Sequence, residues 1–175
     1  MTNKLLISGV ALLLSYAAIA NTTTTEPVFI ASGKQQAQLK SNIGIFEENV
    51  EIVHGSRKIS ADRLEVHRRE ELGENSELLV ATGNPARFQE QQSDGSVISA
   101  SAQEVRYDVA NRTLTISGNA EIMQAGQKIN ADVIVYDMAK QLINAERSSN
   151  SKGQVKTILV PEQKDKKQNK EQGKP

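Results

Sequence analysis

Apolar and polar residues alternate along most of the chain between its two ends. The alternation is clearest over residues 49–52, 57–61, 112–116 and 156–160. A period of two places successive side chains on opposite faces of a strand, so that one face is apolar and the other contacts water. We therefore expect an all-β fold of many short antiparallel strands, with little or no helix.

Turn-forming residues interrupt this alternation at short intervals. They are Gly55-Ser56, Gly83-Asn84-Pro85, Asp94-Gly95, Gly118-Asn119 and Gly126. Asp-Gly between two strands is a strong hairpin signal, and we expect the Gly-Asn pairs at hairpin tips as well. The charged segment 67–77, which contains Gly73, is predicted to be a hairpin loop.

The sequence contains an internal repeat. Residues 49–62 align without a gap to residues 119–132, with identical residues at seven of the fourteen positions, and a further copy runs through 83–88 and 101–107. Repeats of this kind are typical of stacked architectures, in which each unit buries its apolar face against its neighbours.

The repeat also decides the structure expected for residues 138–146, whose propensities permit a helix. Residues 136–139 repeat residues 107–110, and the latter lead into the alternating stretch that begins at Thr113. Equivalent positions should share backbone structure, so we predict a strand.

The first twenty residues have the features of a cleaved signal peptide. Lys4 precedes the apolar stretch 5–14, and Ala18-Ile19-Ala20 provides the small-x-small pattern that signal peptidase reads. We predict cleavage between Ala20 and Asn21 and export from the cytoplasm, since the stretch is shorter than the roughly 20 apolar residues of a membrane span.

Residues 162–175 contain no apolar side chain and five lysines. Such a segment cannot bury enough surface to offset its ordering entropy, so we expect a solvated tail. Residues 21–161 remain as one β domain.

Composition narrows the chemistry that this chain can perform. It has no Cys and no Trp, which excludes disulfides, Cys-ligated metals and a thiol nucleophile. The 21 basic and 21 acidic residues give no excess of positive charge for nucleic acid. His54 and His67 lack metal-ligand spacing, and Asp62 and Asp132 occupy equivalent repeat positions, where a structural turn role explains both. We expect no catalytic residue, no metal site, no cofactor and no nucleic-acid partner.

The apolar face of such a sheet must close on itself, pack against another sheet or hold a ligand. The candidate inner-face residues are Val50, Ile52, Ile59, Ala61, Leu64, Val66, Phe88, Val105, Tyr107, Leu114, Ile116, Ile122, Ile129, Ile134 and Tyr136. One interpretation is that they form only a core. The other is that two layers separate at one rim and some of these side chains contact lipid tails, each buried CH₂ contributing about 0.8 kcal/mol.

Several sequence elements together resemble a known family. They are the leader, Glu26-Pro27-Val28-Phe29-Ile30, the repeated Gly-Asn-Ala-Glu and Ile-Asn-Ala-Asp elements, Tyr107-Asp108, and the closing residues 155–161. Over residues 24–161 the chain is similar to the OstA-like family of periplasmic lipopolysaccharide-transport proteins, although Glu48 and Gly33 depart from the family pattern. The resemblance implies a slightly twisted, V-shaped antiparallel β-jellyroll of about sixteen short strands with open ends, located in the periplasm.

The resemblance also implies a function without catalysis. The protein would bind lipopolysaccharide, through its lipid A part, in an apolar groove and would bridge the inner and outer membranes by end-to-end docking of β-strands, including head-to-tail self-association. The implied groove residues are Val28, Ile30, Val50, Ile52, Phe88, Tyr107, Val109, Ile116, Ile122 and Tyr136.

The resemblance assigns a partner to each end. The edge formed by Val28, Phe29 and Ile30 would accept a component of the inner-membrane transport complex. The edge formed by Thr157, Ile158, Leu159 and Val160 would meet a component of the outer-membrane translocon. Exposed strand edges invite such strand addition.

One alternative stays open, namely a structural β-repeat adaptor that self-assembles or binds protein without carrying lipid. The sequence does not separate it from lipid transport, because groove-facing and core-facing residues have the same pattern. An enzyme that acts on envelope glycans is a third, weaker hypothesis.

Overall fold

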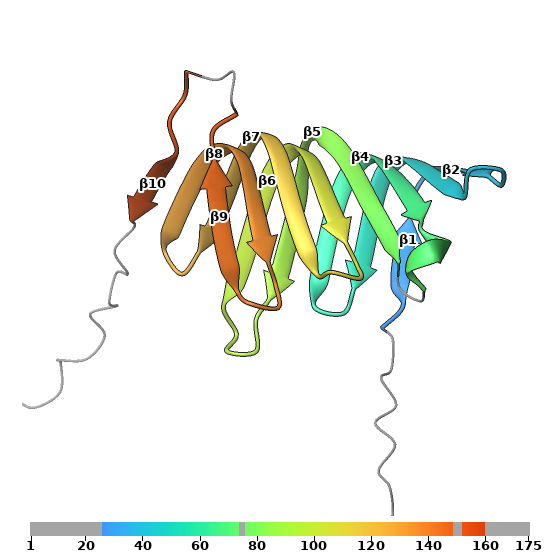
Figure 1. The fold of residues 1–175 in the computed structure, drawn as a ribbon, viewed down its shortest axis with the longest axis horizontal. Coiled ribbons are helices and arrows are strands. Elements are labelled where there is room, and N and C mark those ends of the chain that lie inside the picture. The colour runs from blue at the N-terminus through green and yellow to red at the C-terminus, as the bar shows by residue number, and fades with distance from the viewer. Residues whose placement is uncertain (1–25, 74–75, 149–151, 160–175) are drawn as a thin grey trace, which may run out of the picture.

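The computed structural model describes residues 26–73, 76–148 and 152–159, which form one ten-stranded antiparallel sheet (Figure 1). The strands are β1 (Val28–Ala31), β2 (Lys34–Gln38), β3 (Ile43–His54), β4 (Arg57–Arg68), β5 (Glu77–Gln91), β6 (Val97–Asp108), β7 (Thr113–Gln124), β8 (Gln127–Asp137), β9 (Leu142–Glu146) and β10 (Lys156–Leu159), with one 3₁₀ turn, η1 (Glu70–Leu72). Their order is β1-β3-β4-β5-β6-β7-β8-β10, with β2 also paired to β3 and β9 to β8. The predicted signal peptide with its Ala20–Asn21 cleavage site, Val160 and the tail 162–175 lie outside the described residues.

The strands β3 to β8 are long, with 11 to 15 residues, and each changes register partway along its length. The irregularities lie side by side across the sheet, at Glu47/Val50, Ser60/Arg63, Thr82/Ala86, Ser101/Glu104 and Ser117/Ala120. We call this line the crease. In Figure 1 the strands arch over along one long side of the molecule, and their hairpin connections project along the other.

The crease divides the sheet into two facing layers. Layer A contains β1, β10 and the strand segments that meet at the hairpins 54–57, 91–97 and 124–127. Layer B contains β2, β9 and the segments next to the connections 68–77, 108–113 and 137–142. The side opposite the crease, where these connections lie, is called the mouth.

The described residues form ten strands and not the expected sixteen or so, because the strands continue through the crease. Gly83-Asn84 and Gly118-Asn119 lie inside β5 and β7, not at hairpin tips. Gly118 and Asn119 have φ values of 79° and 54°, and a left-handed backbone serves a β-bulge as well as a turn. The described strands follow one another as in a meander, and a jellyroll topology is not confirmed.

The other local predictions agree more closely with the structure. The hairpins at Gly55-Ser56, Asp94-Gly95 and Gly126 form, but the second has a loop of five residues, 92–96, and not the two residues that Asp-Gly indicates. The strand predicted over 138–146 forms only from Leu142 to Glu146, since residues 138–141 make a turn. The predicted loop 67–77 is shorter than expected, because β4 continues to Arg68, and it contains the turn η1.

The interior between the layers is a wedge. Inner residues next to the crease are alanines with exposed fractions of 0–8%, namely Ala61, Ala81, Ala86, Ala102 and Ala120. Nearer the mouth the inner face carries Phe88, Tyr107 and Tyr136, which are also buried. Small residues let the layers approach at the crease, and larger ones fill the widening space, as close packing requires.

One ion pair fixes the connection between β4 and β5 to the end of β6. Arg69 donates two hydrogen bonds to Asp108, at 3.0 and 2.9 Å, and a third from Nε to the Ser76 carbonyl at 2.8 Å. Hydrogen bonding by Arg69 lowers the pKa of Asp108 from 3.8 to about 2, and Asn111 adds to the effect. The ionised carboxylate therefore stabilises the folded state.

Asp108→Asn should lower the melting temperature by a few degrees near pH 6. The pKa of Asp108 is lower in the folded state than in the unfolded state. Its contribution to the free energy of unfolding is therefore complete above about pH 4 and is lost as the pH falls toward 2. Thermal melts followed by circular dichroism should therefore show the two proteins converging at low pH. A difference that does not change with pH would contradict this assignment.

Candidate functional site

The ten predicted groove residues lie in or against the apolar cluster on the inner face of the folded sheet. Eight of them, Val50, Ile52, Phe88, Tyr107, Val109, Ile116, Ile122 and Tyr136, have exposed fractions of 0–7%. Val28 and Ile30 are partly buried against the same cluster. The structure thus brings these residues together, but the middle of the interior is filled by their own side chains. That they contact lipid stays a prediction.

The two layers are offset along the molecule. Across the interior, His54 on β3 meets Tyr107 on β6, and Glu90 on β5 meets Tyr136 on β8. Each of these strands of layer A therefore faces a strand three places further along the sheet order in layer B. The inner face is consequently less covered at both ends, where Phe46 and Val66 at one end and Ile129 and Ala131 at the other are only partly buried.

An apolar cavity of about 280 Å³ lies at the N-terminal end of the sheet. Its lining includes Ile30 from β1, Ala37 from β2, Phe46 from β3 and Val66 from β4. A Cβ atom at Gly44 would lie 3.1 Å from the Phe46 ring, so glycine leaves room for that ring. The cavity offers apolar side chains to a ligand that could enter from the open end.

Sequence reasoning placed Val66 on the inner face but missed Phe46. A signal was present, because Phe46 is in phase with Val50 and Ile52 on the same strand. The alternating stretch recognised in the sequence begins at Asn49, whereas β3 begins at Ile43 and continues through the crease, with φ values of 68° and 52° at Glu48 and Asn49.

Five polar side chains, which we call the mouth cluster, lie between the layers at the mouth. His54 Nδ1 is 2.9 Å from the Tyr107 hydroxyl, and the Tyr136 hydroxyl donates to Glu90 Oε2 at 3.1 Å. Arg57 Nε lies 3.0 Å from Glu90 Oε1 without making an aligned hydrogen bond. The cluster joins layer A, which carries His54, Arg57 and Glu90, to the two tyrosines of layer B.

Burial sets the protonation of this cluster. It raises the pKa of Tyr107 and, with the nearby Glu90 carboxylate, raises the pKa of Tyr136 to about 12. Burial and then the Arg57 guanidinium lower the pKa of His54. The two phenols are therefore protonated at neutral pH. His54 is neutral, so its Nδ1 atom can accept a hydrogen bond from the Tyr107 hydroxyl.

Each end of the sheet exposes backbone edges. Among the described strands, the outer edges of β1 and β2 at one end and of β9 and β10 at the other have no strand partner. Phe29 on β1 is 63% exposed, and Leu159 on β10 is 75% exposed. Residues 28–30 and 157–159 therefore lie at opposite ends of the sheet (Figure 1), and that these edges take partners stays a prediction.

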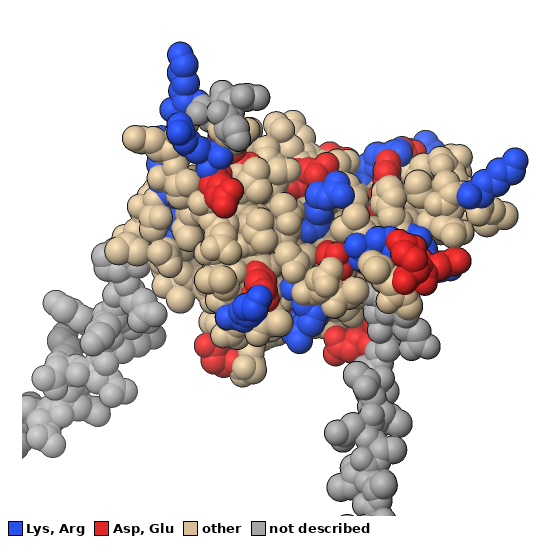
Figure 2. All heavy atoms as spheres, viewed as in Figure 1, with Lys and Arg blue, Asp and Glu red and all other residues tan. Residues whose placement is uncertain are grey.

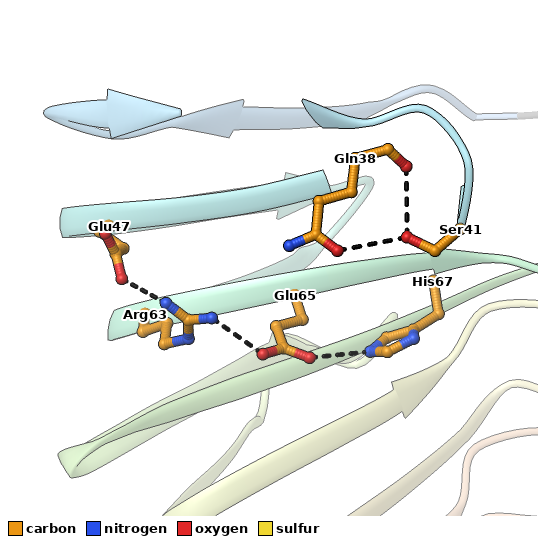
Figure 3. Close-up of polar contacts among 6 residues, drawn as sticks. All are labelled: Gln38, Ser41, Glu47, Arg63, Glu65 and His67. Carbon is orange, nitrogen blue, oxygen red and sulfur yellow. Dashed lines mark hydrogen bonds and ion pairs between the residues drawn. The ribbon is translucent and has the colours of Figure 1, made fainter. Parts of the chain in front are cut away.

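The outer surface carries charges of both signs, interspersed over the face that Figure 2 shows. Near the N-terminal end of layer B, Arg63 contacts Glu47 and also Glu65 at 3.0 Å, and Glu65 is 3.1 Å from His67 (Figure 3). Partly exposed pairs of this kind add little stability. The described residues contain no group of three or more acidic or histidine side chains arranged for a metal ion.

The two repeat-equivalent aspartates lie inside β4 and β8, not in the turns expected for them, and both accept backbone hydrogen bonds. Asp62 accepts a hydrogen bond from the Asn84 backbone N–H at 3.1 Å, and Asp132 accepts one from the Ser148 N–H at 2.8 Å. Asp62 lies within the register change between β4 and β5, so its carboxylate satisfies a backbone group where the ladder is interrupted.

Comparisons with known proteins agree with this architecture. The family model described as LptA/(LptD N-terminal domain) LPS transport protein matches residues 29–142. The lipopolysaccharide export system protein LptA of Haemophilus influenzae is 34% identical over 164 residues, covering 93% of this chain and 94% of that protein. The protein of the same name from Escherichia coli K12 is 33% identical over 177 residues, covering 98% and 94%.

A solved structure has the same fold. It is the crystal structure of LptH, the LptA-homologous periplasmic component of the lipopolysaccharide transport device of Pseudomonas aeruginosa. The TM-score is 0.71 at 20% sequence identity, over 78% of this chain and 96% of that one. No described helix of this chain is long and apolar enough to cross a membrane.

His54→Gln should weaken the pH dependence of stability between about pH 6.5 and 5. The lowered pKa means that the unfolded state takes up a proton more readily than the folded state, so the wild type loses stability as the pH falls below 6.5. Urea unfolding of both proteins at pH 7.5 and 5 measures the effect. Equal losses in the two proteins would show that His54 is not responsible.

Proposed function

The chain belongs to the LptA and LptD N-terminal domain family of lipopolysaccharide transport proteins, and we propose that it binds the acyl chains of lipopolysaccharide on its inner face and bridges the two membranes across the periplasm. The single observation that carries the proposal is the apolar cavity where the inner face of layer B is least covered. A non-enzymatic role agrees with the transport function named for its relatives.

The lipid-binding surface begins at this cavity. Ile30, Phe46 and Val66 provide apolar contacts from three strands, and Ala37 lines the cavity from β2. The surface continues into the buried cluster through Val50, so acyl chains that enter at the open end would meet an unbroken apolar face. The lipid A part is the portion of the molecule whose chains fit such a site.

The open edges support end-to-end docking. The N-terminal end leaves layer B less covered and the C-terminal end leaves layer A less covered, so the exposed inner faces of two successive copies are complementary. Docking β1 of one copy beside the free edge of β10 in another would continue the sheet without closing a ring, which gives a filament. As the family resemblance implies, the N-terminal end would take the inner-membrane partner and the C-terminal end the outer-membrane partner.

The filled middle of the interior favours the second candidate, an adaptor that polymerises without carrying lipid. Phe88 and Tyr107 have exposed fractions of 0% and 1%, as expected of a core that holds only its own side chains. The two candidates differ in one observable, which is whether lipid contacts the inner face.

A photo-crosslinking residue in place of Phe46 should capture lipopolysaccharide in cells that depend on the full-length protein. The neighbouring Ile45 is the matched control, because alternation places it on the outer face of the same strand. We expect lipid adducts from position 46 and few from position 45. Protein adducts alone from position 46 would favour the adaptor.

Phe46→Ala should weaken binding of purified lipopolysaccharide about tenfold, the loss expected for removing one large apolar contact. Ile45→Ala should bind as the wild type does. Equilibrium binding of fluorescently labelled lipopolysaccharide measures both, and equal affinities would contradict the assignment of the cavity.

Removing residues 156–175 should abolish concentration-dependent self-association, because β10 carries the C-terminal edge. A chain that ends at Pro161 is the control, since it keeps β10 and lacks only the Lys-rich tail. Size-exclusion chromatography with light scattering should show monomers for the first variant and wild-type association for the second. Unchanged association in both would contradict docking through β10.

A further inference from the structure

The mouth cluster joins the layers through hydrogen bonds that must break before a ligand can enter the middle of the interior from the side. Tyr107 and Tyr136 of layer B bind His54 and Glu90 of layer A, at 2.9 and 3.1 Å. Phe88, beside them on the inner face, is fully buried. An acyl chain can therefore pack against this part of the inner face only after the two layers move apart at the mouth.

The charged pair within the cluster affects the free energy needed to separate the layers. Arg57 and Glu90 are cross-strand neighbours on β4 and β5, and their side chains are only 11% and 7% exposed. A buried ion pair is commonly less favourable than apolar residues of similar volume, because both ions lose their hydration. Arg57 Nε also lacks an aligned hydrogen bond.

Both charges belong to the same layer. Opening the mouth would expose Arg57 and Glu90 to water without separating them. Part of the hydration free energy that the pair loses in the closed state would then be regained. The two tyrosines, in contrast, lose their partners on opening. Glu90 therefore has two effects, because it accepts the Tyr136 hydrogen bond that joins the layers and forms with Arg57 a buried pair whose rehydration favours their separation.

We propose that the mouth cluster is a reversible latch that gates lateral entry of lipopolysaccharide acyl chains between the layers. Tyr107 and Tyr136 keep the mouth shut when no lipid is bound, and the Arg57–Glu90 pair limits the cost of opening. This inference rests on the proposed function, because it requires that lipid reaches the interior. Acyl chains could then enter each copy through the mouth along its length, as well as through its open ends.

Two variants that share one substitution test the latch. Tyr136→Phe alone leaves Glu90 Oε2 without its hydroxyl donor, so the closed state should weaken and lipid uptake should become about fivefold faster. Tyr136→Phe combined with Arg57→Met and Glu90→Leu replaces the Tyr136–Glu90 hydrogen bond and the buried ion pair with apolar side chains, and leaves the His54–Tyr107 contact in place. The closed state should therefore strengthen, and uptake should slow about fivefold or more.

Asn130→Ala is the control for a general loss of stability. It removes the hydrogen bond from Asn130 to Glu121 at 3.0 Å, which joins β8 to β7 within layer A and does not cross between layers. We expect the uptake rate of this variant to match that of the wild type.

Stopped-flow mixing of the full-length proteins with fluorescently labelled lipopolysaccharide gives the uptake rates. Hydrogen exchange of the hairpins 54–57 and 91–97, measured without lipid, reports opening of the mouth directly. Faster exchange and uptake for Tyr136→Phe, with slower values for the triple variant, would establish the latch.

The possible failures are distinguishable. If the wild type binds lipopolysaccharide and the two variants change in the same direction, or do not differ from it, the latch is wrong and the proposed function stands. If the wild type does not bind lipopolysaccharide at all, the proposed function fails, and the latch fails with it.

Discussion

A single sheet can cover its own apolar face only if neighbouring strands bend at the same height. In this protein the strands β3 to β8 change register along one line, which lets each strand contribute to both layers. The wedge follows from that line, because Ala61, Ala86 and Ala120 allow close approach at the crease and aromatic residues occupy the wider side. Both the filled middle and the open ends of the interior depend on this geometry.

Much of the fold could be predicted from the sequence, because alternation, the internal repeat and the Asp94-Gly95 signal all report local backbone chemistry. The crease could not be predicted from the sequence. Gly118-Asn119 has a left-handed backbone, which both a hairpin turn and a β-bulge require, so the residue types do not distinguish the two. A subtler signal was present. On β4 and β8 the inner-face alternation slips by one residue at the crease, from Ala61 to Leu64 and from Ala131 to Ile134.

The candidate site was predictable to a similar extent. Alternation predicts most of the inner-face residues, and the ten groove residues that the family resemblance implies lie in or against one apolar cluster. Which of them are accessible does not follow, because accessibility depends on the offset between the layers, and the offset is a tertiary property. Phe88, for example, is buried in the middle of the wedge, whereas Phe46 lines the cavity at the N-terminal end.

The central claim is that lipid acyl chains contact the inner face where the offset leaves it uncovered. Methyl-labelled protein in complex with lipopolysaccharide permits a direct measurement, by nuclear Overhauser effects between acyl-chain protons and protein methyl groups. The account predicts contacts to Ile30 and Val66, which line the N-terminal cavity, and none to Val80, whose register position places it on the outer face of layer B. Contacts confined to Val80 and other outer-face methyl groups, or no contacts at all, would contradict it.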